Sequence, residues 1–324
     1  MSFYSKIAQI LMNLSPNFPL YNEIGFKQED FKNPSFISLT KKGKNEQIFQ
    51  WIINDIKKYS EFQFEKYFPE FQYEKYIKGK TVLDVGCSIG GLTMHFAEEY
   101  KVDKMFGIDC HNKSIDAVNN YIIKEQTLTS EYTFVCAKAE QMPFDDHTFD
   151  AIISNDTFEH VRNIRKTLIE CKRVTKPGGI ILLVFPSYHF PLGGGHIEMV
   201  TNTLFLEWIF SPKILNQAII NITSKWDSRY NWFLNANENS EKIKWLEVES
   251  GIGINGVTYN EFNSVVNDLE FSKVKFIKSP IASCSTKMKK LSFRKYFIRF
   301  NFLLLRTPFL IDHLSYRLVY IIRV

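Results

Sequence analysis

Through the middle of the chain, hydrophobic and polar positions follow two alternating patterns. One is a short continuous apolar run, and the other is a longer stretch in which apolar residues recur every three or four positions. The segment 81–100 contains both: an apolar run at 82–83 is interrupted by glycines, and Leu92, Phe96 and Tyr100 then follow at helical spacing. This order predicts a buried strand, a glycine-containing loop and a helix.

The same alternation continues to residue 185. Further strands are predicted at Lys104–Asp109, Tyr132–Cys136, Phe149–Ser154 and Ile180–Phe185. The intervening stretches have helical spacing, as at Ile164, Leu168 and Cys171. Strands that alternate with helices predict an α/β fold, with a doubly wound, mostly parallel sheet covered on both faces. The ligand of such a sheet is expected at the carboxyl ends of the strands.

Polar residues and one proline lie at or just past these predicted strand ends. They are Asp84, Asp109, Asn155 and Pro186. Because parallel strands end at the same edge of a sheet, we expect these positions to lie near one another. An acidic residue at the position of Asp109 can bind both hydroxyls of a ribose, which predicts an adenosine-containing ligand.

The glycine loop distinguishes between two ligand classes. A dinucleotide site requires G-x-G-x-x-G, but Ser88 occupies the second glycine position, and Asp84 precedes the loop. That carboxylate would repel a diphosphate and attract an ammonium group. Gly86 and Gly90 are expected to let the backbone approach the ligand.

At this point the segment resembles motif I of the class I S-adenosylmethionine (SAM)-dependent methyltransferases. The resemblance extends over about residues 81–186 and implies a seven-stranded Rossmann-like sheet with SAM as cofactor. Cofactor contacts are implied at Asp84, Gly86, Cys87, Gly90, Asp109, Cys110, Ala139, Glu140 and Asn155. Ala139 and Glu140 match the loop beside the adenine. The chain departs from the family at Lys138, where many members carry an aspartate.

Methyl transfer from a sulfonium is an in-line displacement that requires alignment and exclusion of water. A general base is needed only for a weak nucleophile such as a hydroxyl, and the candidates are His196, His160 and His189. Each also has a structural interpretation; the pair Glu159–His160 would pin its loop by a hydrogen bond at a helix start. The sequence has no metal-ligand cluster, which predicts metal-independent transfer.

The regions around this core are predicted as additions to it. Residues 1–79 are expected to form a helical N-terminal cover, ahead of the SAM-binding core at 80–186. Residues 187–256 are interpreted as a cap insertion that binds the acceptor; a helical elaboration without ligand contact is the alternative. Residues 257–324 complete the core with a helix and antiparallel strands, interrupted by a basic amphipathic insertion at about 279–315.

The last region has a clear helix start, because Thr258 and Glu261 have the spacing of a capping box. Apolar residues at helical spacing follow, and strands are predicted at Phe271–Ile277 and Leu318–Ile322.

Charge is distributed unevenly along the chain. The net charge of +5 is too small to indicate a specific nucleic-acid partner, but Lys and Arg are concentrated after residue 287. The stretch 287–306 suits either peripheral contact with a membrane or a cap helix whose basic side chains run along apolar surface. We expect neither a signal peptide nor a transmembrane helix. Five cysteines without a C-x-x-C pattern indicate a reducing, cytoplasmic compartment, with a place at the inner face of a membrane as an option.

These observations predict a SAM-dependent methyltransferase that acts on a small-molecule or glycan-type acceptor. Two alternatives remain: a non-catalytic regulatory protein that binds SAM or a nucleoside, and a nicotinamide-dependent oxidoreductase. Ser88 and Asp84 disfavour the oxidoreductase. The sequence specifies no oligomeric state.

Overall fold

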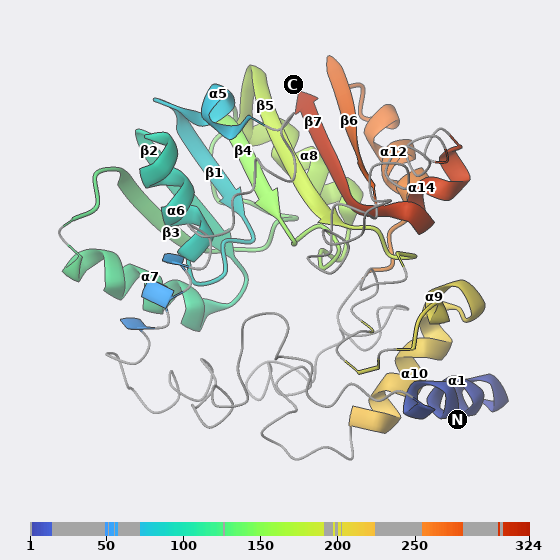
Figure 1. Ribbon diagram of the computed structural model, residues 1–324. Coiled ribbons are helices and arrows are strands. Elements are labelled where there is room, and N and C mark those ends of the chain that lie inside the picture. The colour runs from blue at the N-terminus through green and yellow to red at the C-terminus, as the bar shows by residue number, and fades with distance from the viewer. Residues whose placement is uncertain are drawn as a thin grey trace, which may run out of the picture. The chain divides into compact units, whose positions relative to one another are not determined.

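The structure is a computed structural model (Figure 1). It describes residues 2–14, 49–50, 52–54, 56–57, 72–125, 127–190, 197, 200–201, 203–223, 255–280, 304 and 307–324. Contacts divide the chain into two compact units. Unit 1 comprises Met1–Ser35, Pro186–Glu261 and Pro280–Tyr316, and unit 2 comprises Phe36–Phe185, Phe262–Ser279 and Arg317–Val324. Each unit is described by itself.

Unit 2 is built on a seven-stranded sheet with the order β3-β2-β1-β4-β5-β7-β6 (Figure 1). The strands are β1 (Thr81–Val85), β2 (Lys104–Asp109), β3 (Glu131–Cys136), β4 (Phe149–Asn155), β5 (Thr175–Pro186), β6 (Lys273–Pro280) and β7 (Ser315–Arg323). The pairs β1–β2, β1–β4, β2–β3 and β4–β5 are parallel. The predicted fold class, a doubly wound and mostly parallel seven-stranded sheet, is therefore confirmed.

Helices cover the sheet, and apolar side chains of alternate strand residues face them. They are α5 (Tyr73–Ile77), α6 (Gly91–Tyr100), α7 (Asn112–Lys124), α8 (Ile164–Val174) and α12 (Tyr259–Asp268). On one face, Val82 and Ile153 pack in a cluster with Tyr73 and Phe96. On the other face, Phe185 contacts Phe262 of α12, with ring centroids 4.9 Å apart.

Strand β5 begins earlier than the predicted start at Ile180. It follows α8 directly at Thr175, and its pairing with β4 shifts register between Phe149 and Ala151. Residues 177–179, with the sequence Pro-Gly-Gly, form a bulge within the strand, where Gly178 has φ +76°. A Cβ atom on Gly179 would lie 2.5 Å from the Thr175 side chain, so the bulge requires glycine there.

Unit 1 contains α1 (Phe3–Leu14), α9 (Leu206–Ile209), α10 (Pro212–Thr223) and α14 (Pro308–Leu314). Helix α1 packs against α10 through buried Ala8, Met12, Leu215 and Ala218. The hydroxyl of Thr201 donates to the Met12 carbonyl at 2.8 Å, and that of Thr203 donates to the Leu11 carbonyl at 2.9 Å. These bonds satisfy carbonyls that the end of α1 leaves without helical partners.

The start of α12 is the capping box that the sequence predicts. The Thr258 N–H donates to Glu261 Oε2 at 2.9 Å, and the Glu261 N–H donates to the Thr258 hydroxyl at 3.3 Å. Most of the predicted acceptor-binding insertion and the basic stretch 287–306 lie outside the described residues, as does most of residues 1–79. Among the helices that the structure describes, none has the length and apolarity needed to span a membrane.

Candidate cofactor and acceptor site

The glycine loop between β1 and α6 is fixed by hydrogen bonds to the end of β2. The N–H groups of Gly86 and Cys87 donate to the Ile108 carbonyl at 2.8 and 3.0 Å. Ser88 and Gly90 have φ values of 52° and 79°, so the chain turns through left-handed backbone at both positions. The loop is therefore a rigid turn at the carboxyl edge of the sheet, as its pattern predicts.

Packing within the chain accounts for the two glycines. A Cβ atom on Gly86 would lie 2.0 Å from the Thr157 hydroxyl oxygen, and one on Gly90 would lie 2.6 Å from a methyl of Val118. The position that either Cβ atom would take is thus occupied by a side chain of the chain itself. Gly86 thus allows the segment after β4 to lie against the loop.

Asp84 is buried in the middle of the sheet edge, with β2 and β4 on its two sides. The Thr93 hydroxyl, in the first turn of α6, donates to its Oδ2 at 2.6 Å. Burial raises the pKa of Asp84 to about 7, although the hydrogen bond from Thr93 opposes this shift. Near neutral pH the carboxyl is thus close to half protonated, and a cation placed beside it would favour its charged form.

Asp109 connects the end of β2 to the glycine loop. Its Oδ2 accepts from the Ser88 N–H at 3.0 Å, and its Oδ1 accepts from the His111 N–H at 2.8 Å. The carboxylate stays partly exposed. It lies at the strand end, where the sequence predicted the contact to ribose hydroxyls.

The neighbouring cysteines Cys87 and Cys110 are also near this edge. Burial raises the pKa of both thiols, in the case of Cys110 to about 11. Both are therefore neutral at physiological pH and offer little negative charge to a cationic ligand.

Asn155, at the end of β4, has one satisfied and one unsatisfied polar atom. The hydroxyl of Tyr73 donates to its Oδ1 at 3.0 Å, whereas its buried Nδ2 has no hydrogen-bond partner. The sequence analysis predicted Asn155 but overlooked Tyr73, which comes from α5 and is distant in the sequence. A free amide donor at a strand end suits an oxygen atom of a ligand.

Glu159 follows four residues later and is buried with both carboxylate oxygens unpartnered. In the part of the chain that the structure describes, these two oxygens and Asn155 Nδ2 are the buried side-chain polar atoms without a partner. Burial raises the pKa of Glu159 well above its usual value; the charge of Asp156 adds to this, and that of Arg317 opposes it. Arg317 of β7 forms an ion pair with Asp156.

The Glu159 carboxyl does not make the hydrogen bond at a helix start that was considered for the pair Glu159–His160. Asn163 caps α8 instead, because its side chain accepts from the Lys166 N–H at 2.9 Å. Glu140 holds the residues before that cap by accepting from the Arg162 and Asn163 N–H groups. His160 Nε2 lies 3.8 Å from Glu159 Oε1, within the range of an ion pair if the imidazole is protonated.

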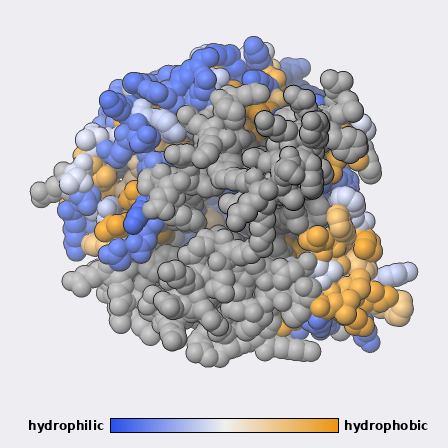
Figure 2. Space-filling model, in the orientation of Figure 1, coloured by the Kyte–Doolittle hydropathy of each residue, from blue (hydrophilic) through white to orange (hydrophobic). Residues whose placement is uncertain are grey.

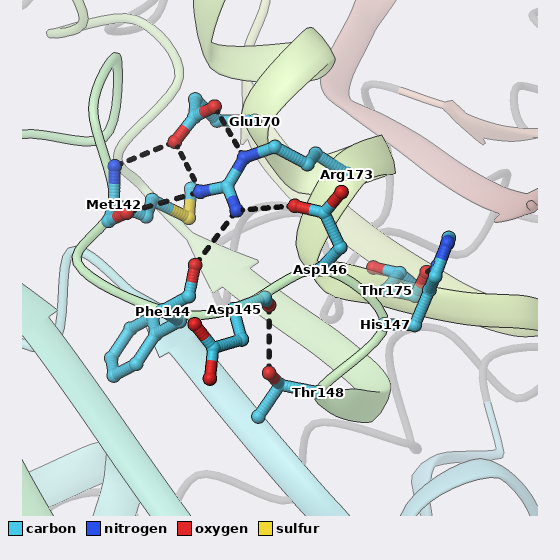
Figure 3. Close-up of polar contacts among 9 residues, drawn as sticks. All are labelled: Met142, Phe144, Asp145, Asp146, His147, Thr148, Glu170, Arg173 and Thr175. Atoms are coloured by element: carbon cyan, nitrogen blue, oxygen red, sulfur yellow. Dashed lines mark hydrogen bonds and ion pairs between the residues drawn. The ribbon is translucent and has the colours of Figure 1, made fainter.

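The loop after β3, which carries Ala139 and Glu140, is fixed by Arg173 of α8 (Figure 3). The guanidinium of Arg173 donates to the carbonyls of Met142 and Phe144, at 3.0 and 2.7 Å, and to Asp146 Oδ1 at 2.8 Å. Glu170 accepts two hydrogen bonds from the same guanidinium and one from the Met142 N–H. These contacts raise the pKa of Arg173 and tie the loop to α8.

The sequence analysis overlooked this network. Its local signal was the spacing of Glu170 and Arg173, three positions apart on a predicted helix, which brings their side chains together. That spacing does not reveal the loop carbonyls that share the guanidinium, since they lie about 30 positions earlier, with separations of 29 and 31 residues.

The other two histidine candidates belong to unit 1. His189 Nδ1 lies 3.0 Å from the Glu207 carbonyl oxygen, and its ring stacks on that of His313 at a centroid distance of 5.2 Å. His196 lies outside the described residues. Among those described, no three His, Cys, Asp or Glu side chains form a group that could hold a metal ion. Metal-independent transfer thus stays a prediction.

Residues 83–183 match a family model described as a methyltransferase domain. Over about 100 residues the chain is 33% identical to a probable tocopherol O-methyltransferase of Oryza sativa, 32% to norajmaline N-methyltransferase of Rauvolfia serpentina, and 33% to a sterol 24-C-methyltransferase of Schizosaccharomyces pombe. These alignments cover 32% to 33% of this chain and 29%, 36% and 26% of the respective relatives, so the chain spans less than half the length of each.

Among solved structures, a phosphoethanolamine N-methyltransferase of Haemonchus contortus is similar over 81% of this chain and 53% of its own, at 14% identity and a TM-score of 0.46. That likeness is too distant to carry an argument about function. The family model covers the strands and loops that carry most of the predicted cofactor residues, and the relatives match over a segment of similar length. Residues 83–183 of this chain are therefore similar to the methyltransferase domain of class I SAM-dependent methyltransferases.

Proposed function

We propose that this chain is a methyltransferase that binds SAM at the carboxyl edge of β1, β2 and β4 and transfers its methyl group to a small-molecule or glycan-type acceptor. The observation that carries this proposal is the arrangement of Asp84, the glycine loop, Asp109 and Asn155 along that edge. A buried carboxyl beside the loop suits an ammonium group, and a carboxylate at the end of β2 suits ribose hydroxyls.

The chain's residues would bind and orient the cofactor while the sulfonium supplies an already activated methyl group. The free amide donor of Asn155 suits the carboxylate of the methionine moiety. Arg173 keeps the loop of Ala139 and Glu140 in place for the adenine. Fixed hydrogen bonds around the site reduce the reorganisation that the reaction requires.

A general base for a hydroxyl acceptor is proposed at His160. It follows β4 at the same edge as Asn155, and its Nε2 lies 3.8 Å from Glu159 Oε1. His189 and His196 remain candidates for the same role. Because the relatives are named for transfer to oxygen, nitrogen and carbon, the acceptor atom is left open in this proposal.

The acceptor class is supported by the small organic molecules in the relatives' names, tocopherol, norajmaline and a sterol. We also propose a cytoplasmic location. The cysteines described by the structure, Cys87, Cys110, Cys136 and Cys171, are unpaired, which is the usual state in a reducing compartment.

Calorimetric titration with SAM, its demethylated product S-adenosylhomocysteine (SAH) and NADH tests the cofactor. We expect both SAM species to bind and NADH not to bind. Binding of NADH without either SAM species would overturn the proposal in favour of an oxidoreductase. A panel of sugars, phenols and amines incubated with methyl-labelled SAM then tests turnover; SAM binding without label transfer to any class would favour the regulatory alternative.

The substitution Asp109→Ala tests the ribose contact. We expect SAH affinity to fall between several-fold and about a hundredfold, as for loss of hydrogen bonds to a charged group. Since Asp109 also accepts from the Ser88 N–H, Asp109→Asn serves as a comparison that keeps an acceptor for this N–H while removing the carboxylate charge. Unchanged affinity in Asp109→Ala would place the ribose elsewhere.

A further inference from the structure

Unit 1 exposes a set of large hydrophobic side chains on α1 and on the segment that leads into α9. They are Phe3, Tyr4, Ile10 and Leu14 on α1, and Leu204, Phe205, Trp208 and Ile209 around α9. We call this set the α1–α9 surface. Figure 2 shows hydrophobic residues gathered where Figure 1 places α1, α9 and α10. A soluble protein rarely exposes so many large apolar side chains together unless they contact a partner.

Helix α1 carries large apolar side chains on its exposed side as well as on its buried side. Its Ala8 and Met12 are buried against α10, and the side that carries Phe3 and Ile10 is exposed at 71% and 61% for these two residues. A helix packed on one side of a soluble unit normally presents polar residues on the other side. The exposed face of α1 therefore lacks the composition of a surface that only meets water.

The segment around the start of α9 exposes two aromatic side chains, and one of them, Phe205, has an unfavourable backbone conformation. Phe205 has φ 66°, a left-handed backbone that a bulky residue rarely adopts, and its ring is exposed against that of Trp208. The Trp208 indole N–H donates to the His189 carbonyl at 2.7 Å, which fixes the direction of this ring. The two aromatic residues are thus positioned at the surface by the backbone and by a hydrogen bond.

The charges beside these side chains are all positive. Lys6 is exposed on α1 and Lys213 on α10, and the sequences of both helices contain no acidic residue. The acidic residue of α9, Glu207, is buried. Across α1, residues 203–211 and the side chains described on α10, no carboxylate is exposed.

We propose that the α1–α9 surface docks onto an anionic lipid membrane. Aromatic and aliphatic side chains enter the boundary between headgroups and acyl chains, while Lys6 and Lys213 meet anionic headgroups. A symmetric contact with a second copy fits less well, because the same surface on both copies would add its lysines to an interface without carboxylates. This surface is distinct from the basic stretch 287–306, which the sequence analysis considered for membrane contact.

Vesicle sedimentation of the full chain tests the proposal. We expect the protein to pellet with phosphatidylcholine vesicles that contain phosphatidylglycerol at low salt, and to pellet less with phosphatidylcholine alone or at high salt. The double variant Phe205→Asn with Ile209→Asn should weaken binding about a hundredfold, about tenfold for each apolar side chain removed from the lipid. Asparagine tolerates the left-handed backbone at position 205, so this variant should fold.

The matched control is Ile123→Asn in unit 2, because Ile123 is a large aliphatic residue of α7 that is 79% exposed. It should bind vesicles like the unsubstituted chain. Vesicles with brominated acyl chains should quench tryptophan fluorescence in the unsubstituted chain, and Trp208→Phe should remove most of that quenching.

Three results would overturn the proposal. The first is no binding of the unsubstituted chain to the anionic vesicles at low salt. The second is equal binding by the double variant, which would assign the contact to another surface such as the basic stretch. The third is a dimer that the double variant dissociates while vesicle binding is unchanged, which would make this surface a contact between copies.

Discussion

Two segments that flank β4, the loop that leads into it and the segment that follows it, differ in how completely their polar groups are satisfied. The loop after β3 shares the guanidinium of Arg173 among two carbonyls and two carboxylates. The segment after β4 leaves Asn155 Nδ2 and the Glu159 carboxyl buried without hydrogen-bond partners. An unsatisfied buried polar group costs free energy. The unpaired groups after β4 can therefore still form hydrogen bonds to a ligand, whereas those of the loop after β3 are already bonded within the chain. This difference separates a supporting loop from one that suits a ligand.

The largest expected effect comes from removing the centre of the supporting loop. Arg173→Ala should lower the free energy of unfolding by about 2–4 kcal/mol, because Glu170 and the loop carbonyls lose their charged donor. Urea unfolding measures this change. Arg165→Ala is the matched control: Arg165 lies on the same helix and pairs with Asp268 at the surface, so its loss should cost less than about 1 kcal/mol. Equal effects would contradict the distinction between these two arginines.

An effect of opposite sign is expected in the segment after β4. Because the pKa of Glu159 is raised, the folded chain keeps the proton of this carboxyl. The unfolded chain releases that proton once the pH exceeds the ordinary pKa of a glutamate. Stability is therefore lost as pH rises from about 4.5 towards the folded pKa, by at most about 1.4 kcal/mol per pH unit. Glu159→Gln should remove this slope. The free energy of unfolding of the variant should therefore increase relative to that of the unsubstituted chain as pH rises. Parallel stability curves from pH 5 to 8 would show that Glu159 finds a partner in solution.

Asp84 predicts a pH dependence of ligand binding. With its pKa raised to about 7, an ammonium group beside it would favour the charged form and release a proton below that pH. SAH affinity should therefore rise up to about tenfold between pH 6 and 7.5, with proton release detectable by calorimetry in two buffers. Asp84→Asn should bind weakly with no such dependence. An unchanged pH profile in this variant would mean that the ammonium lies away from Asp84.

The smallest effect is expected at the cap of α8. Asn163→Ala removes the acceptor for the Lys166 N–H and should cost about 1 kcal/mol in unfolding free energy. Asn163→Ser, which can still cap, should restore most of this loss. A cost as large as that of Arg173→Ala would suggest that the cap also holds Glu140 and the supporting loop.

The strands, their order along the chain and the edge that collects Asp84, Asp109 and Asn155 follow from apolar runs and their spacing. The capping box at Thr258 and Glu261 follows from two residues close in sequence. Each of these features depends on local patterns, in which the period and the flanking residues carry the information. The sequence also placed Asn155 at a strand end, because it follows an apolar run.

Other features depend on contacts between residues far apart in the sequence. Nothing near Gly86 indicates that Thr157 fills the space beside it, and nothing near Asn155 indicates Tyr73. Glu159 was expected to make a local hydrogen bond, but Asn163 and Glu140 already satisfy the donors there. All spatial neighbours of a polar group together determine whether it has a hydrogen-bond partner. Unpaired groups can therefore be identified only in the folded structure.

The two threonine hydroxyls that close α1 have a consequence for protein synthesis. Their partners are separated from them by 189 and 192 residues, so α1 leaves the ribosome long before Thr201 and Thr203 exist. Until then the nascent helix presents apolar side chains with nothing to pack against, a state prone to aggregation and suited to chaperone capture. Translation speed through the intervening residues should therefore influence the yield of correctly folded protein.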